Sequence, residues 1–206
     1  MPGLTAEVCF PALSEEGDLP QQGVYVLPTV ADRQFRAQVM AALSTGDIPV
    51  IATDHAPHTR AEKERGRHDA WQAAPGYPAL ETSLPLAYDA MLRGALSPQR
   101  FVEATATAPA QIAGVTGKGR ILTGADADLL LLDPGGDWTV DQSTMHSLVG
   151  WSPFHGRTLR GRLVATYLRG QLIAHQGQIV QPGLGRFTGR PVRQPHPPSQ
   201  TGAPDE

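Results

Sequence analysis

The sequence predicts an α/β fold joined to a small β module, and three observations support this prediction. Residues 32–44 carry apolar side chains at helical spacing, and Gly46 follows as a stop signal. Residues 48–52 form an apolar run without alternation, which is typical of a strand buried on both faces. With a β-prone run before the helix, this order indicates a βαβ unit in a parallel sheet. After Gly119 the pattern changes to short strands separated by turn residues, which is typical of a separate β module.

The other elements follow in order along the chain. Residues 5–10 and 24–27 are β-prone runs, and Pro28 ends the second. Ser97 is a candidate N-cap with Pro98 at the first helical position. The remaining expected elements are a long polar loop over 53–79, helices over 81–93, 98–106 and 107–114, and strands over 127–133, 163–169 and 171–180, with a hairpin turn near Gly170.

The expected organisation has three parts. Residues 1–115 form the α/β part and residues 116–188 form the β module. Residues 189–206 contain five prolines and no Leu, Ile or Phe. Because such a stretch buries too little apolar surface to offset its ordering entropy, we expect a disordered tail there.

Composition excludes several classes of protein. The chain has 206 residues, with 17 basic and 20 acidic side chains and a formal net charge of −3. A nucleic-acid binder usually shows a basic excess, so no nucleic-acid partner is expected. No apolar run is long enough to span a bilayer, so no membrane partner is expected either. The single cysteine, Cys9, excludes an internal disulfide, fits a reducing compartment, and suggests a small core side chain in a cytoplasmic protein.

The densest group of chemically capable side chains follows the apolar strand directly. Asp54, His55 and His58 lie within five residues, immediately after residues 48–52. Active sites of α/β folds lie at the carboxyl ends of the strands. There an aspartate can bind a metal and move a proton, and an imidazole can bind a metal or an anionic substrate. The alternative is a polar loop in which Asp54 merely caps the turn after the strand.

A second candidate is the segment that begins with Pro75 and Gly76. These residue types allow a backbone to approach a ligand closely, although an ordinary turn has the same composition. Glu81 follows, and it can be buried and paired or can simply place a favourable charge at a helix N-terminus.

Other residues have plainer interpretations. His146, His155 and His175 show no metal-ligand spacing. Trp138 and Trp151 are expected to cover the β module.

Several motifs together resemble one family. In chain order they are IATDHAPHT at 51–59, PGYPALETSLPL at 75–86, TATAPAQIAG at 105–114, KGRILTGADADLLLLDP at 118–134 and WSPFHGRTLRGRLVATYLRG at 151–170. The chain resembles the C-terminal half of dihydroorotases of the long bacterial type, which are cyclic amidohydrolases, over about residues 5–180. Hydantoinases and allantoinases share this architecture and are close alternatives.

The resemblance implies the last strands of a metal-dependent (β/α)8 barrel with a small β module. It implies the reversible cyclisation of N-carbamoyl-aspartate to dihydroorotate in pyrimidine biosynthesis, with zinc as the cofactor and a small-molecule substrate. By motif, Asp54 matches a catalytic aspartate that binds the metal and moves a proton. His58, Pro75 and Gly76 match residues that bind the substrate.

Two positions depart from the family pattern. Residues 5–12 contain no histidine where the family has Pro-His-His, and Leu27 stands where the family has an asparagine that contacts substrate. The other metal ligands of the family lie upstream of the region matched here. We therefore expect that this truncated chain alone neither retains zinc nor catalyses the reaction.

Three alternatives to a dihydroorotase part remain. The chain can be a non-catalytic scaffold for an aspartate transcarbamoylase subunit, a fragment of a hydantoinase or allantoinase, or a remnant without function. Association with itself or with a transcarbamoylase is the partner prediction.

Overall fold

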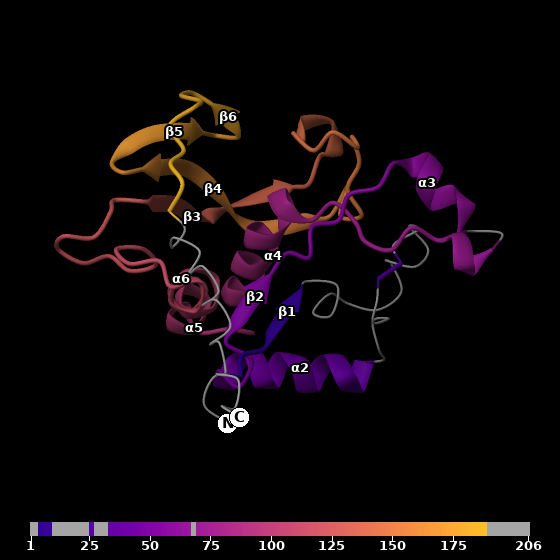
Figure 1. Ribbon diagram of the computed structural model, residues 1–206, viewed down its shortest axis with the longest axis horizontal. Coiled ribbons are helices and arrows are strands. Elements are labelled where there is room, and N and C mark those ends of the chain that lie inside the picture. Colours follow the sequence, from indigo (N-terminus) through magenta and orange to yellow (C-terminus); the bar gives the residue numbers. More distant parts are fainter. Residues whose placement is uncertain (1–3, 10–24, 27–32, 67–68, 189–206) are drawn as a thin grey trace, which may run out of the picture.

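The computed structural model describes residues 4–9, 25–26, 33–66 and 69–188 of the chain. Within them, two parallel strands and a four-stranded antiparallel sheet lie on opposite sides of helix α4 (Leu80–Leu92), and helix α2 (Arg33–Thr45) lies beside the parallel pair (Figure 1). None of the helices within the described residues combines the length and apolar character that crossing a membrane requires.

The expected βαβ unit is confirmed. Strands β1 (Glu7–Cys9) and β2 (Val50–Ala52) pair in parallel, with Val8 opposite Ile51, and α2 lies between them in sequence. The helix buries Leu43 against Val8 in a cluster that also contains Leu96 and Ala104. In β2 itself Val50 is buried and Ile51 packs partly buried against this cluster, so the strand is less completely buried than its apolar, non-alternating sequence predicts.

The expected strand over 24–27 is wrong for the two residues of it that the structure describes. Tyr25 and Val26 belong to no strand. The carbonyl oxygen of Tyr25 accepts a hydrogen bond from the Gly76 amide at 2.6 Å, so this segment bonds to a loop instead of a strand. Val26 is buried in the core, which explains its apolar character. Leu27 and the expected tail at 189–206 lie outside the described residues.

The expected long loop over 53–79 contains a helix. Helix α3 (Arg60–Arg65) begins with a capping box, in which Thr59 Oγ1 accepts the Glu62 amide at 3.2 Å and the Glu62 carboxylate accepts the Thr59 amide at 2.7 Å. A 3₁₀ turn, η2 (Ala70–Gln72), follows. The Thr-x-x-Glu spacing is the sequence signal for this helix.

The next helical stretch agrees with the sequence, except for one widened turn. Helix α5 (Pro98–Val102) begins at Ser97, whose hydroxyl accepts the Arg100 amide at 3.1 Å. A π-helical turn, η3 (Glu103–Thr107), connects it to α6 (Ala108–Ala113). Pro109 has no amide hydrogen to donate within the helix, and the widened turn lies immediately before it.

The β module is an antiparallel sheet of four strands in sequence order. They are β3 (Leu129–Thr139), β4 (Thr158–Leu168), β5 (Gln171–His175) and β6 (Gln178–Ile179), with the 3₁₀ turn η4 (Gln142–Thr144) between β3 and β4. Strand β3 runs further than expected because an irregularity between Asp133 and Asp137 accommodates Pro134. The expected single strand over 171–180 is wrong, because a tight turn at Gln176 and Gly177 divides it.

Both hairpin turns of the module have the same backbone geometry. Arg169 and Gly170 have φ values of 49° and 79°, and Gln176 and Gly177 have 49° and 78°. Two successive positive φ values are typical of the type I′ turn, which matches the twist of the strands it joins. The turn expected near Gly170 is therefore confirmed.

One hydrophobic core contains side chains from both the helical part and the β module. Tyr77 and Leu86 contribute to it from one side, and Phe154 and Leu159 from the other. Trp151 is only 2% exposed and lies in the same cluster, where it contributes to a core that the β module shares with the helical part. Trp138 packs against this cluster while partly buried.

A buried carboxylate joins helix α4 to strand β4. Asp89 is 3% exposed, accepts the Arg160 main-chain amide at 2.8 Å, and pairs with the Arg93 side chain at 2.8 Å. Burial opposes ionisation of Asp89, but these hydrogen bonds and the charge of Arg93 outweigh it and lower the pKa of the carboxyl. The close approach of helix and strand depends on Gly161, where a Cβ would lie 2.5 Å from Tyr88 Cε1.

The substitution Gly161→Ala tests this contact. Its φ of 72° and the collision with Tyr88 should together reduce the free energy of unfolding by about 2–4 kcal/mol. Gly156→Ala is the matched control, since its φ is 81° and no atom lies within 4 Å of the new Cβ. It should cost only the backbone strain, about 1–2 kcal/mol. Urea unfolding followed by circular dichroism measures both, and equal losses would contradict the close α4–β4 contact.

Candidate active site

Asp54 lies at the carboxyl end of β2, where the sequence analysis placed it. It is exposed, comes two residues after the last residue of the strand, and has a φ of 48°. Aspartate is one of the few side chains that adopt this left-handed conformation readily. The backbone therefore turns sharply at Asp54 and leaves its carboxylate at the edge of the parallel pair.

The two sequence candidates lie side by side in the structure. His55 and Tyr77 form a parallel bridge, and the Ala56 amide donates to the Tyr77 carbonyl oxygen at 3.2 Å. Gly76 has a φ of 109°, and a Cβ there would lie 2.5 Å from the Ala56 Cβ. Only glycine permits this approach, so the close backbone contact suggested by composition is made with Ala56 of the chain itself.

The polar main-chain groups of Gly76 are already bonded within the protein. Its amide donates to the Tyr25 carbonyl oxygen at 2.6 Å, and its carbonyl oxygen accepts from Lys63 Nζ. Gly76 can therefore offer a ligand only an oxygen that is already hydrogen-bonded. Pro75 is exposed and has no amide hydrogen, so its carbonyl is its one polar main-chain group.

His55 has a role that sequence analysis missed. Its Nδ1 accepts the main-chain amides of Ala79 and Leu80, both at 3.0 Å, at the start of α4. Ala79 has no side chain that can cap the helix, so the imidazole supplies the missing acceptor. In the neutral ring this assigns the proton to Nε2. The alanine at the helix start was the sequence signal that the cap comes from elsewhere.

His58 lies in a loop that is anchored on Trp151. The His58 carbonyl oxygen accepts from Trp151 Nε1 at 2.8 Å, and the Arg60 guanidinium lies 4.3 Å from the centre of the indole ring. The His58 ring is partly exposed, with Nδ1 3.9 Å from the Glu62 carboxylate. The backbone at His58 is therefore fixed, while its imidazole remains partly accessible to solvent.

Tyr77 fills the space beneath the two segments. Its side chain is fully buried, and its hydroxyl donates to the Thr53 carbonyl oxygen at 3.3 Å. Burial raises the pKa of the Tyr77 hydroxyl well above its usual range, and Cys9 and Asp54 add to the effect. Tyr77 therefore stays neutral and serves as a hydrogen-bond donor.

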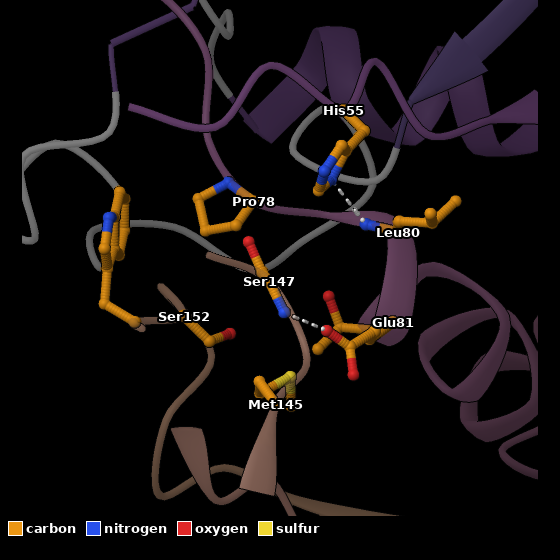
Figure 2. A pocket seen from close by; sticks show the side chains of 9 residues that line it. His55, Pro78, Leu80, Glu81, Met145, Ser147 and Ser152 are labelled. Carbon is orange, nitrogen blue, oxygen red and sulfur yellow. Dashed lines mark hydrogen bonds between the residues drawn. The ribbon is translucent and has the colours of Figure 1, made fainter. Parts of the chain in front are cut away.

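A small pocket opens between the start of α4 and the chain before Trp151 (Figure 2). Glu81 lies on its wall, and its carboxylate accepts the main-chain amides of His146 at 2.9 Å and of Ser147 at 3.0 Å. The His146 Nδ1 lies 3.0 Å from the same carboxylate. Glu81 is thus paired but only partly buried, and it also lies in the first turn of α4, so both interpretations hold in part. Besides Glu81, the pocket is lined by His55, Pro78, Leu80, Thr82, Met145, Ser147, Trp151 and Ser152.

The described residues do not form a complete metal site. Within residues 4–9, 25–26, 33–66 and 69–188, no group of three or more His, Cys, Asp or Glu side chains is placed to hold a metal ion. A catalytic zinc takes about three protein ligands. Asp54 can supply one carboxylate, so any metal here needs ligands from outside this set.

Curated relatives of the chain include two kinds of enzyme. It is 40% identical to the dihydroorotase of Halobacterium salinarum over 180 residues, which is 86% of this chain and 40% of that protein. It is 38% identical to the L-hydantoinase of Paenarthrobacter aurescens over 168 residues, 80% of this chain and 37% of that protein. No protein-family model matches the chain.

Solved structures of hydantoinases share the fold. The L-hydantoinase from Arthrobacter aurescens matches with a TM-score of 0.78 at 34% identity, over 86% of this chain and 40% of that one. The D-hydantoinase from Thermus sp. matches with a TM-score of 0.80 at 29% identity, over 90% and 43%.

In sequence and in fold, the chain is similar to part of the proteins of the amidohydrolase superfamily. Within it, the chain resembles the C-terminal half of the dihydroorotases, with the hydantoinases close by. The expected partial barrel with a small β module is confirmed. The chain spans about two fifths of the length of these relatives.

Trp151→Phe tests the anchoring of the His58 loop. It removes the Nε1 hydrogen bond and part of a fully buried ring, so the free energy of unfolding should fall by about 1–3 kcal/mol. The control is Trp71→Phe, because Trp71 is 97% exposed and should be neutral. Urea unfolding followed by circular dichroism measures the stability of both variants. Equal stabilities of Trp151→Phe and Trp71→Phe would show that Trp151 does not anchor the loop.

The Glu81 contacts make stability depend on pH. Burial opposes ionisation of Glu81, but hydrogen bonds from His146 and Ser147 outweigh it and lower its pKa from 4.5. The stabilisation is therefore present above pH 4.5 and is lost as pH falls through the lowered folded-state pKa. Glu81→Gln should cost about 1–2 kcal/mol at pH 7, and progressively less as the pH falls below 4.5 and through the lowered folded-state pKa.

Thermal unfolding across this range measures the effect, with the exposed Glu7 as control in Glu7→Gln. A Glu81→Gln loss that does not change with pH would rule out the ionised pair as its source.

Proposed function

We propose that the chain supplies one wall of the active site of a dihydroorotase-like cyclic amide hydrolase. The observation that carries this proposal is the position of Asp54. Its carboxylate lies at the carboxyl end of a parallel strand, beside the segment that contains Pro75 and Gly76. Active sites of barrels are built at this end of the strands.

In this proposal each site residue has a separate role. Asp54 is the catalytic aspartate, which provides one metal ligand and accepts and returns the proton of the hydrolytic water. His58 offers a partly exposed imidazole to an anionic substrate. Pro75 and Gly76 contact the substrate through their carbonyl oxygens, of which that of Gly76 also accepts from Lys63. Hydrolysis adds water across the ring amide, with hydroxyl going to the acyl carbon and a proton to the ring nitrogen.

We propose further that this chain alone retains no zinc and has no activity. The described residues hold fewer ligands than a catalytic zinc takes, and the remaining ligands would come from a separate polypeptide or a longer chain. No step of the reaction is therefore assigned to a metal held by this chain.

Two substrate rings fit this proposal. The relative at 40% identity is a dihydroorotase, which favours the ring of dihydroorotate and a role in pyrimidine biosynthesis. The relative at 38% identity is a hydantoinase, which makes a hydantoin the alternative. Both are cyclic amides, so the same aspartate chemistry serves either. A scaffold role beside an aspartate transcarbamoylase, self-association and a cytoplasmic location remain predictions.

Reconstitution tests the proposal. The chain is mixed with the part of the Halobacterium salinarum dihydroorotase that lies outside the matched region, and dihydroorotate and hydantoin turnover are measured with added zinc. We expect no turnover by either piece alone and turnover by the mixture. Asp54→Asn should then lower kcat by about 10²–10⁴-fold, because asparagine keeps the backbone turn but loses the charge and the base.

Asp47→Asn is the matched control, since this aspartate lies in the turn before β2 and its carboxylate bonds to Thr45. It should leave turnover unchanged. Turnover by the isolated 206-residue chain that disappears in Asp54→Asn would contradict the claim that the chain alone is inactive. A mixture that assembles but never turns over would favour the scaffold alternative.

A further inference from the structure

Lys63 is a buried cation that the proposed chemistry does not use. It lies in α3, is 4% exposed, and its Nζ donates to the carbonyl oxygen of Ala74 at 2.6 Å and to that of Gly76. These two carbonyls flank Pro75. The ammonium group thus binds the backbone on both sides of the residue proposed to meet the substrate.

We infer that Lys63 is a positioning residue that fixes the backbone of residues 74–76 against the loop that carries Asp54. The inference rests on the proposed function for its catalytic meaning. That Lys63 fixes the geometry of this segment is inferred from its contacts alone.

The contacts explain why a charged side chain is needed here. A buried cation is tolerated only where it is well hydrogen-bonded, and two carbonyl oxygens 11 and 13 residues away provide those bonds. Burial lowers the pKa of Lys63. A hydrogen bond from a charged donor is stronger than one from a neutral donor, so the ammonium holds these carbonyls more firmly than a neutral side chain would.

The helix that carries Lys63 is held in place at its N-terminus. Helix α3 is held at its start by the Thr59–Glu62 capping box, and the residue before it, His58, bonds to Trp151 through its carbonyl oxygen. Arg60 lies over the same indole ring. The start of α3 is therefore fixed by contacts outside residues 74–76, while its C-cap Gly66 packs against the neighbouring Ala73.

A shift of the held segment would reach Asp54. The Gly76 backbone approaches Ala56 so closely that a Cβ would lie 2.6 Å from the Ala56 carbonyl oxygen, and the Ala56 amide bonds to the Tyr77 carbonyl. Ala56 is two residues from Asp54. Any relaxation of Gly76 is thus transmitted through main-chain contacts to the catalytic loop.

Lys63→Met tests the inference on the chain as it exists. Methionine keeps an apolar stem in the buried site and removes the donors. Hydrogen exchange should accelerate by about tenfold or more at the Ala56 and Gly76 amides, whose hydrogen bonds depend on this segment, and should be unchanged in β3 and β4. The matched control is Lys118→Met, because Lys118 pairs with Asp126 and Asp128 away from α3 and should leave both amides unchanged.

Restoring the ammonium distinguishes positioning from simple packing. In a Cys9→Ala background, Lys63→Cys gives a single thiol that is alkylated in the unfolded chain and refolded. Reaction with 2-bromoethylamine forms a C–S bond, releases bromide and the thiol proton, and restores an ammonium group at nearly the original distance. Reaction with iodoacetamide adds a neutral amide. The aminoethyl product should recover slow exchange at Ala56 and Gly76, and the amide product should not.

Equal protection in both alkylated products, or unchanged exchange in Lys63→Met, would overturn the inference. These readouts do not require turnover, so they judge Lys63 even if the reconstituted enzyme is inactive. In an active mixture Lys63→Met should lower kcat/KM by about tenfold or more, as expected when a contact segment is misplaced. An unchanged kcat/KM would overturn the catalytic meaning of the contact while leaving the proposed function intact.

Discussion

The main-chain contact between Ala56 and Gly76 determines how the candidate site is arranged. It brings together two segments that are about twenty residues apart, one carrying Asp54 and the other carrying Pro75. The glycine makes the approach possible, and Lys63 holds the second segment from its other side. Without this contact, Asp54 would be an exposed aspartate on an isolated turn. With it, a carboxylate and a backbone segment share one edge of the parallel strands, which is the arrangement that the proposed hydrolysis requires.

The shared core explains why the β module matters to this site. Trp151 comes from the chain between β3 and β4, yet it bonds to the His58 carbonyl 93 residues earlier. Glu81 at the start of α4 binds the main chain at His146 and Ser147 in the same region. The β module therefore helps to support the loop that contains Asp54 and His58. Its fold and the geometry of the site are stabilised by the same contacts.

Local patterns predicted much of this arrangement, and tertiary contacts account for the rest. The strand β2 and the position of Asp54 after it could be predicted, because both follow from consecutive residues: an apolar run predicts the strand, and the chain direction places Asp54 at its carboxyl end. The division of residues 171–180 into two strands also has a local cause, the turn at Gln176 and Gly177. The alanine before α4 indicates only that its cap comes from elsewhere. The sequence does not identify His55 or Lys63 for their roles, since their partners lie 24 and 11 residues away and are main-chain atoms.

The central claim is the proposal that this chain carries one wall of an amidohydrolase-like site, in which the described residues do not supply a full set of metal ligands. Metal content tests it most directly, because a complete site would retain its ion. The purified chain is incubated with zinc, dialysed and analysed for metal beside its Asp54→Asn variant. The account predicts far less than one zinc per chain in both. One zinc per chain in the wild type that is lost in Asp54→Asn would contradict it.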